Sequence, residues 1–241
     1  MVAGTRETGI AQHRRLLDTI GTSIVEGTIP AGARLLTADL AEEYGASRSA
    51  TREVVRVLET TGMVDVRRRA GIEVLPATRW NAYAPELIRW RLDGADRLRA
   101  LHELSQLRSA IEPLAARLAA EQATPEDRAA LVGAVLGMVE HSARADEPVY
   151  LGHDVAFHTA ILRGSGNAYL AGLADVVGAL LHGRTAHALM PHEADETALR
   201  LHQEVAAAVT ARDPDAAAAA MAAIVAEADQ AVEAMADPGR S

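Results

Sequence analysis

Two side chains of metal-binding type lie four residues apart in the second half of the chain. Asp154 and His158 have the spacing that places two residues on one face of a helix, one turn apart. A carboxylate and an imidazole so placed could ligate one metal ion, and His202, on another predicted helix, could supply a further nitrogen. The chain has nine histidines among 241 residues, so such pairs also arise by chance. Spacing alone therefore leaves open both a metal site and a buried Asp–His hydrogen bond.

A different chemistry, the reading of DNA, is indicated by the run SRSATR at residues 47–52. Arginine forms two-pronged hydrogen bonds with guanine edges, and serine reaches phosphates or bases. A recognition helix carries such residues at its N-terminal end, because that end enters the major groove. We therefore expect Ser47, Arg48, Ser49 and Arg52 to face DNA from the start of a helix over residues 48–61.

The elements that would hold this helix follow from the neighbouring sequence. Helices are predicted over residues 10–26 and 38–44, and Ser47 is expected to cap the helix that follows. Its buried face is expected to consist of Ala50, Val54, Val57 and Leu58. Residues 63–75 predict a hairpin that turns at Ala70-Gly71 and carries Arg67, Arg68 and Arg69 at its tip. Three helices followed by a basic-tipped hairpin describe a winged helix-turn-helix domain, which we place at residues 8–76.

The second half of the chain predicts helices only. Residues 98–236 divide into six or seven helical segments, over residues 97–122, 125–141, 149–163, 168–189, 194–211 and 215–236. In the first segment, large apolar residues recur on one side: Leu98, Leu101, Leu104, Leu107, Ile111, Leu114 and Leu118. The predicted fold class is mainly α, with a winged helix-turn-helix domain, a linker at residues 77–97 and an all-helical bundle.

Composition and charge narrow the function classes. The net charge is −9, but residues 1–78 hold ten arginines and ten acidic residues, so the acidic excess lies in the second part. The chain has no cysteine, which excludes a disulfide framework or a thiolate metal site. No signal peptide and no run of about 18 apolar residues is recognised. We therefore expect a cytoplasmic protein.

The segment EGTIPAGARLLTADLAEEYGASRSATREVVRVLETTGMVDVRRRAGIEV resembles the DNA-binding domain of the GntR family of bacterial transcription regulators. The resemblance covers residues 10–75 and rests on the order and spacing of the glycines, the Ser-Arg-x-x-x-Arg-Glu motif and the glycine of the hairpin. This sequence departs from the family pattern at Ala31, which separates the usual Pro-Gly pair, and at Ala46, where valine is commoner. The resemblance implies that the DNA interface contains Arg34, Ser47, Arg48, Ser49, Arg52 and Gly71, to which we add Arg68 at the hairpin tip.

Residues 98–235 resemble the FCD effector domain of the FadR subfamily of these regulators. The motifs are LRSAIEPLAARLAA from residue 107, Asp-x-x-Phe-His from residue 154 with Ser-Gly-Asn from residue 165, and His202-x-x-Val followed by Ala-Arg-Asp-Pro. In that subfamily a polar cavity often holds a divalent ion (Zn, Ni or Mn) on one Asp and three His, and the ion helps to bind a small carboxylate. Asp154, His158 and His202 match the first three ligands, and Ile224 stands at the fourth. A three-ligand site completed by effector oxygens and a metal-free polar pocket both stay open.

The same resemblance supplies effector-binding candidates. Arg108 matches a position that faces the cavity, and its planar fork suits a carboxylate; the alternative is that it pairs with Glu112 one turn on. Asn167 and Arg184 are further candidates. The linker run WNAYAPELIRWRL is similar to the branch of the subfamily that answers sugar acids such as galactonate or gluconate.

The function predicted is a ligand-responsive transcription regulator, a repressor released from its operator by a small carboxylate. A homodimer would set two recognition helices on a pseudo-palindromic operator in double-stranded DNA. One alternative is a metal-dependent enzyme fused to a winged helix, although no nucleophile turn or glycine-rich phosphate loop occurs in the sequence. Another is an architectural DNA binder whose helical domain only dimerises.

Overall fold

The structure is a computed structural model of the chain, and it describes the backbone of residues 3–67, 71–186 and 192–236. Side chains are described over residues 11–67, 71–183 and 192–230. The chain divides into two compact units, Met1–Ala95 and Asp96–Ser241.

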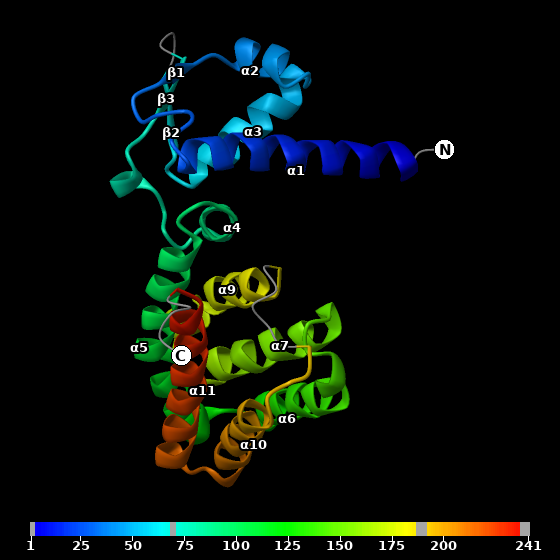
Figure 1. Cartoon of the computed structure of the whole chain (residues 1–241), viewed down its shortest axis with the longest axis vertical. Helices are drawn as coiled ribbons and strands as arrows, with labels where there is room; N and C mark the ends of the chain where they lie inside the picture. Colours follow the sequence, from blue (N-terminus) through cyan, green and yellow to red (C-terminus); the bar gives the residue numbers. More distant parts are fainter. Residues whose placement is uncertain (1–2, 68–70, 187–191, 237–241) are drawn as a thin grey trace. The chain divides into compact units, whose positions relative to one another are not determined.

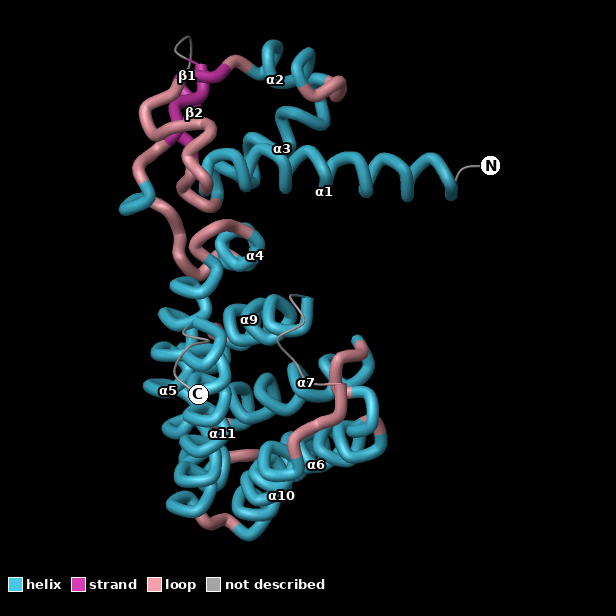
Figure 2. Tube along the Cα trace, viewed as in Figure 1, coloured by secondary structure: helices cyan, strands magenta, loops and turns pink. Residues whose placement is uncertain are grey.

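The first unit holds three helices and a small sheet, followed by a fourth helix (Figure 1). The helices are α1 (Ala3–Val25), α2 (Thr37–Glu43), α3 (Arg48–Thr60) and α4 (Pro85–Asp93), with a 3-10 turn at Ala77–Arg79. The strands are β1 (Arg34–Leu35), β2 (Val64–Arg67) and β3 (Gly71–Val74), paired antiparallel in the order β1-β3-β2. This arrangement confirms the predicted winged helix-turn-helix with a hairpin wing (Figure 2).

The capping prediction for α3 is confirmed, but its buried face differs from the expected one. The Ser47 side chain accepts a hydrogen bond from the Ala50 amide at 3.2 Å, which satisfies one open backbone donor at the helix start. Thr51 and Val55 join Val54 and Leu58 as buried residues, whereas Ala50 and Val57 are only partly buried, with Val57 packed against the core. Thr51 is able to be buried because its hydroxyl donates to the Ser47 carbonyl at 3.1 Å.

The wing depends on a glycine at the start of β3. Gly71 has φ +83°, a left-handed conformation that side chains disfavour. A Cβ there would lie 2.8 Å from the Leu35 carbonyl oxygen, so the residue is also needed for the close approach of β1. Its role is therefore explained by backbone geometry, and DNA contact is not required to account for it.

Helix α4, which falls in the predicted linker, packs on α1 within the first unit. Trp90 is buried, and its indole N–H donates to Asp18 at 3.0 Å. Arg89 forms an ion pair with the same carboxylate. Gly21 makes room for the indole ring, since a Cβ there would lie 2.5 Å from Trp90.

The second unit is all-helical in the part of the chain that the structure describes, as predicted. Its helices are α5 (Arg97–Gln122), α6 (Pro125–Glu140), α7 (Pro148–Gly164), α8 (Ala168–Ala171), α9 (Ala174–Ala186), α10 (Glu196–Ala211) and α11 (Pro214–Ala236), with a 3-10 turn at Ser142–Arg144. The single helix expected over residues 168–189 is wrong, because Gly172 and Leu173 separate α8 from α9. None of the described helices is long and apolar enough to cross a membrane.

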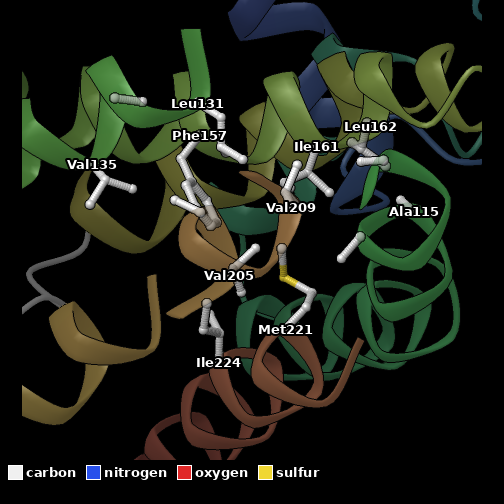
Figure 3. Close-up of a cluster of buried hydrophobic side chains, with 14 of the residues drawn as sticks. Ala115, Leu131, Val135, Phe157, Ile161, Leu162, Val205, Val209, Met221 and Ile224 are labelled. Carbon is white, nitrogen blue, oxygen red and sulfur yellow. The ribbon is translucent and has the colours of Figure 1, made fainter. Parts of the chain in front are cut away.

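The core of this unit uses small residues where the sequence predicted large ones. Helix α5 packs most extensively along α11, and the buried apolar residues in the second half of α5 are Ala115, Ala116, Ala119 and Ala120. Two members of the predicted apolar side, Leu98 and Leu114, are exposed, whereas Ile111 and Leu118 are partly buried against the core. Short side chains let two helices approach closely. Around them lie larger apolar residues from other helices, seen in Figure 3: Phe157, Ile161, Val205, Val209, Met221 and Ile224.

Candidate functional site

Five charged or polar side chains form a buried network in the helical unit. Arg108 and Glu112 come from α5, Asp154 and His158 from α7, and His202 from α10. Each is less than a tenth exposed, and Glu112 is fully buried. Arg108 and Glu112 are four residues apart, and so are Asp154 and His158. This spacing aligns side chains on one helix face. Polar groups removed from water to this degree must satisfy one another or bind a ligand.

Arg108 and Glu112 form a two-pronged ion pair inside the unit. Arg108 Nε donates to Glu112 Oε1 at 2.8 Å, and Nη2 donates to Oε2 at 3.1 Å. Nη2 also lies 3.1 Å from His158 Nε2. The ion pair expected as the alternative to effector binding is therefore present. A carboxylate effector would have to bind a guanidinium that already pairs with the Glu112 carboxylate.

The predicted metal-binding residues come together. Asp154, His158 and His202 each offer one ligand atom, and these atoms lie within 4.8 Å of one another. Asp154 Oδ1 lies 3.5 Å from His158 Nε2 and 3.4 Å from His202 Nε2. Phe157 packs against both rings, with centroids 5.1 and 4.6 Å away, and gives the site an apolar wall. This buried group could hold a metal ion.

The state of His202 shows how well the group fits an ion. Its Nδ1 lies 2.7 Å from the Ala198 carbonyl oxygen, which only accepts, so Nδ1 carries the hydrogen. In the neutral ring Nε2 then presents a lone pair, and this buried atom has no hydrogen-bond partner among the described residues. It faces the Asp154 carboxylate, another electron-pair donor. Two donors turned toward each other without a hydrogen between them suit a cation.

The network also shifts the ionisation of its members. Burial alone would raise the pKa of Glu112, but Arg108 and His158 outweigh it and hold that pKa at about 2. Burial likewise opposes ionisation of Asp154, yet the neighbouring His158 and His202 rings hold its pKa well below the usual range. For His158, burial and Arg108 lower the pKa, but Glu112 and Asp154 prevail and raise it.

The charges of the network do not balance without a further cation. Two carboxylates, Glu112 and Asp154, face one guanidinium, Arg108. An uncompensated buried charge is costly, so the site favours either a proton on a histidine or a bound metal ion.

Two buried groups of the site were not found from the sequence as functional candidates. Glu112 was named only as a competitor for Arg108, although its i+4 spacing was a usable signal. Tyr150 is 4% exposed, and its pKa is raised by burial first and then by Asp154 and Glu227. Nothing in its local sequence distinguishes it from an ordinary core tyrosine.

The other candidates of the helical unit have different positions. Asn167 caps α8, where its side-chain oxygen accepts from the Tyr169 amide at 2.9 Å and the Leu170 amide. Ile224 is buried among apolar residues and offers no ligand atom. The side chain of Arg184 lies outside the described residues.

The DNA-facing candidates of the first unit lie on the surface. The exposed members are Arg34, Ser47, Arg48, Ser49 and Arg52. The last four occupy the cap and first turns of α3, as predicted for a recognition helix. Arg68 lies outside the described residues.

Comparison with protein families decides the class. Residues 103–227 match the FCD domain, and residues 12–74 match the gntR family of bacterial regulatory proteins. The chain belongs to the GntR family and carries an FCD domain. The resemblance seen in the sequence is confirmed, and this GntR protein is a DNA-binding transcription regulator, not an enzyme.

Individual relatives agree with that class. The galactonate operon transcriptional repressor of Escherichia coli (strain K12) is 30% identical over 205 residues, which cover 84% of this chain and 89% of that protein. A probable D-xylose utilization operon transcriptional repressor of Paenarthrobacter nicotinovorans is 27% identical over 211 residues, covering 88% and 83%. The solved structure of E. coli McbR/YncC has the same fold, with a TM-score of 0.54 at 19% identity over 95% of this chain and 98% of that one.

Proposed function

We propose that this GntR protein is a repressor that leaves its operator when a small sugar-acid carboxylate binds its helical unit. The proposal rests chiefly on the buried network, in which His202 Nε2 has no partner among the described residues and carboxylates outnumber guanidinium groups. The galactonate operon repressor and the D-xylose repressor support the choice of a sugar-derived effector. The protein acts as a homodimer, because two recognition helices are needed to read a pseudo-palindromic operator.

In this proposal a divalent ion (Zn, Ni or Mn) is held by Asp154, His158 and His202. Supporting it are the mutual reach of the three ligand atoms and the lone pair of His202 Nε2. When bound, the ion would act as a Lewis acid that attracts effector oxygens. A site with only three protein ligands keeps positions open for such oxygens, because Ile224 contributes none.

The charge of the network favours a particular effector. One divalent ion together with one carboxylate adds a single net positive charge, which is what two buried carboxylates and one guanidinium lack. A monocarboxylate therefore leaves the buried site neutral, whereas a dicarboxylate leaves it negative. Arg108, with its planar fork, is the protein cation available to the effector carboxylate, and Glu112 is the partner with which that carboxylate competes.

The experiment is an operator-binding titration. An operator selected in vitro from random duplexes is bound by the full chain, and fluorescence anisotropy is followed with galactonate, gluconate and a matched dicarboxylate. Each acid is tested with added Zn²⁺ and with a chelator.

We expect a monocarboxylic sugar acid to weaken operator binding only when the metal is present. An effect that survives the chelator would remove the metal from the proposal and leave a polar pocket. If no acid changes operator binding, the effector proposal is wrong and the helical unit serves dimerisation alone.

A further inference from the structure

One buried carboxylate, Glu112, contacts both halves of the proposed site. Its Oε2 lies 3.0 Å from His158 Nδ1, and the carboxylate also receives both hydrogen bonds of the Arg108 fork. Among the described side chains, the group that could share a metal ion contains Asp154, His158 and His202 but not Glu112. Glu112 therefore contacts a proposed ligand, His158, but does not itself belong to the ligand group.

We propose that Glu112 is the positioning residue that orients His158 for metal binding. An ionised carboxylate only accepts hydrogen bonds, so the ring places its Nδ1–H toward Glu112. Nε2 then carries the lone pair, and it lies 3.1 Å from the Arg108 Nη2 donor and 3.5 Å from Asp154 Oδ1. A carboxylate behind a metal-binding histidine fixes the tautomer and the ring orientation in this way. This inference rests on the proposed metal site.

The neighbouring histidine has the same orientation through a different anchor. His202 is held by the Ala198 carbonyl at its Nδ1, and its Nε2 also faces Asp154. Two rings from two helices thus turn the same nitrogen toward one carboxylate. This agreement supports a shared ligand position, and the support is independent of Glu112.

Glu112 is well fixed for this role. It has no solvent-exposed surface, and its two hydrogen bonds from Arg108 are charge-assisted. The same ion pair holds the guanidinium that we assign to the effector. One carboxylate therefore positions both an effector-binding side chain and a metal ligand.

The test uses Zn²⁺ and the full-length protein. We would measure Zn²⁺ affinity by competition with a chromophoric chelator for the wild type, Glu112→Gln, Glu112→Ala and Glu121→Gln. Glu121 is an exposed carboxylate on the same helix and serves as the matched control. We expect Glu112→Ala to bind Zn²⁺ roughly 10- to 100-fold more weakly and Glu121→Gln to match the wild type. Glu112→Gln retains an oxygen that accepts from Nδ1–H, so its loss should be smaller than that of the alanine variant.

A second measurement separates orientation from a general loss of structure. Long-range proton–nitrogen NMR spectra of the Zn²⁺-bound wild type, labelled with ¹⁵N-histidine, should show His158 with its proton on Nδ1 and the metal on Nε2. Zn²⁺ on Nδ1 would overturn the role of Glu112 while leaving the proposed metal site intact. Equal affinity and an unchanged spectrum in Glu112→Ala would overturn it as well.

The proposed site and the inference fail in distinguishable ways. If the wild type binds no Zn²⁺, the metal proposal is wrong, and the inference falls with it. If Glu112→Ala does not fold, the wild-type spectrum still decides, because it alone reports which nitrogen of His158 carries the proton.

Discussion

At the scale of single residues, the ion pair between Arg108 and Glu112 has consequences for stability as well as for binding. Both side chains are buried, so removing one partner leaves a charge without compensation. We expect Arg108→Ala to lower the free energy of unfolding by about 3–5 kcal/mol, measured by urea unfolding. The double variant Arg108→Met/Glu112→Leu should recover most of this loss while no longer responding to the effector. A single variant as stable as the double one would contradict the ion pair.

The raised pKa of His158 gives a pH dependence with a definite sign. Burial and Arg108 lower this pKa, but Glu112 and Asp154 raise it above 6.5 in the folded state. The stability that the charged ring contributes is therefore complete below pH 6.5 and is lost as pH rises through the folded pKa.

In the presence of a chelator, we expect the melting temperature to fall as the pH rises above 6.5 and through the raised pKa of His158. Added Zn²⁺ should stabilise the protein increasingly over the same range, because the metal binds the deprotonated ring. His158→Gln should lack both effects, whereas the exposed His192→Gln should keep them. A Zn²⁺ effect that does not grow with pH would argue against His158 as a ligand.

Substitution of Arg52, on the surface of α3, tests whether this helix contacts DNA. The side chain is exposed in the second turn, so its removal should leave the melting temperature nearly unchanged. We expect Arg52→Ala to weaken operator binding by about 1–3 kcal/mol, seen by anisotropy. Arg56→Ala is the matched control: Arg56 lies one turn further along and pairs with Glu53 at 3.0 Å. Equal losses in the two variants would place the groove contact elsewhere on the helix.

Some residues of the buried network could be predicted from the sequence, and others could not. Asp154, His158 and His202 were found because two share a helix turn and the third falls in a family motif. The role of Glu112 behind His158 was not found, since the two are joined only by the packing of α5 against α7. Contacts between helices are not encoded in the spacing along either one.

At the scale of elements, α5 shows why apolar periodicity identifies a helix but not its buried side. The leucines correctly indicated a helix that ends at Gln122. The buried apolar residues in its second half are nevertheless alanines, and Leu114 is 47% exposed. Side-chain size predicts burial poorly where two backbones approach closely.

The contact between α1 and α4 requires a glycine at position 21, whereas another helical glycine, Gly133, has open space around it. A Cβ at Gly21 would lie 2.5 Å from the buried ring of Trp90, which cannot move aside easily. We expect Gly21→Ala to destabilise the protein by about 1–3 kcal/mol through overpacking. Gly133, in α6, has no atom within 4 Å of the same position, so Gly133→Ala should stabilise by about 0.5–1 kcal/mol. Urea unfolding of both variants measures the difference, and a neutral Gly21→Ala would mean that α4 packs loosely on α1.

At the scale of the whole molecule, the architecture was more predictable than the site. Turn glycines, helix caps and a basic hairpin tip are local signals, and they gave the winged helix-turn-helix. The helical unit followed from periodicity and from the absence of strand-like alternation. The buried network required three helices to meet: spacing indicated Asp154 and His158, and the family motifs supported His202 and added Arg108.

Control of DNA binding by an effector is a property of the complete chain and obeys a strict symmetry. If the effector weakens operator binding by a given factor, then operator DNA must weaken effector binding by the same factor. We expect a factor of about 5 to about 150, equivalent to about 1–3 kcal/mol of coupling. Anisotropy gives the operator affinity with and without the acid, and calorimetry gives the affinity for the acid with and without the operator, both at fixed Zn²⁺ and salt. Unequal factors would show that the two measurements do not belong to one closed binding cycle, for example because the acid removes the metal. Equal factors that vanish in His158→Gln would tie the coupling to the buried network in the helical unit.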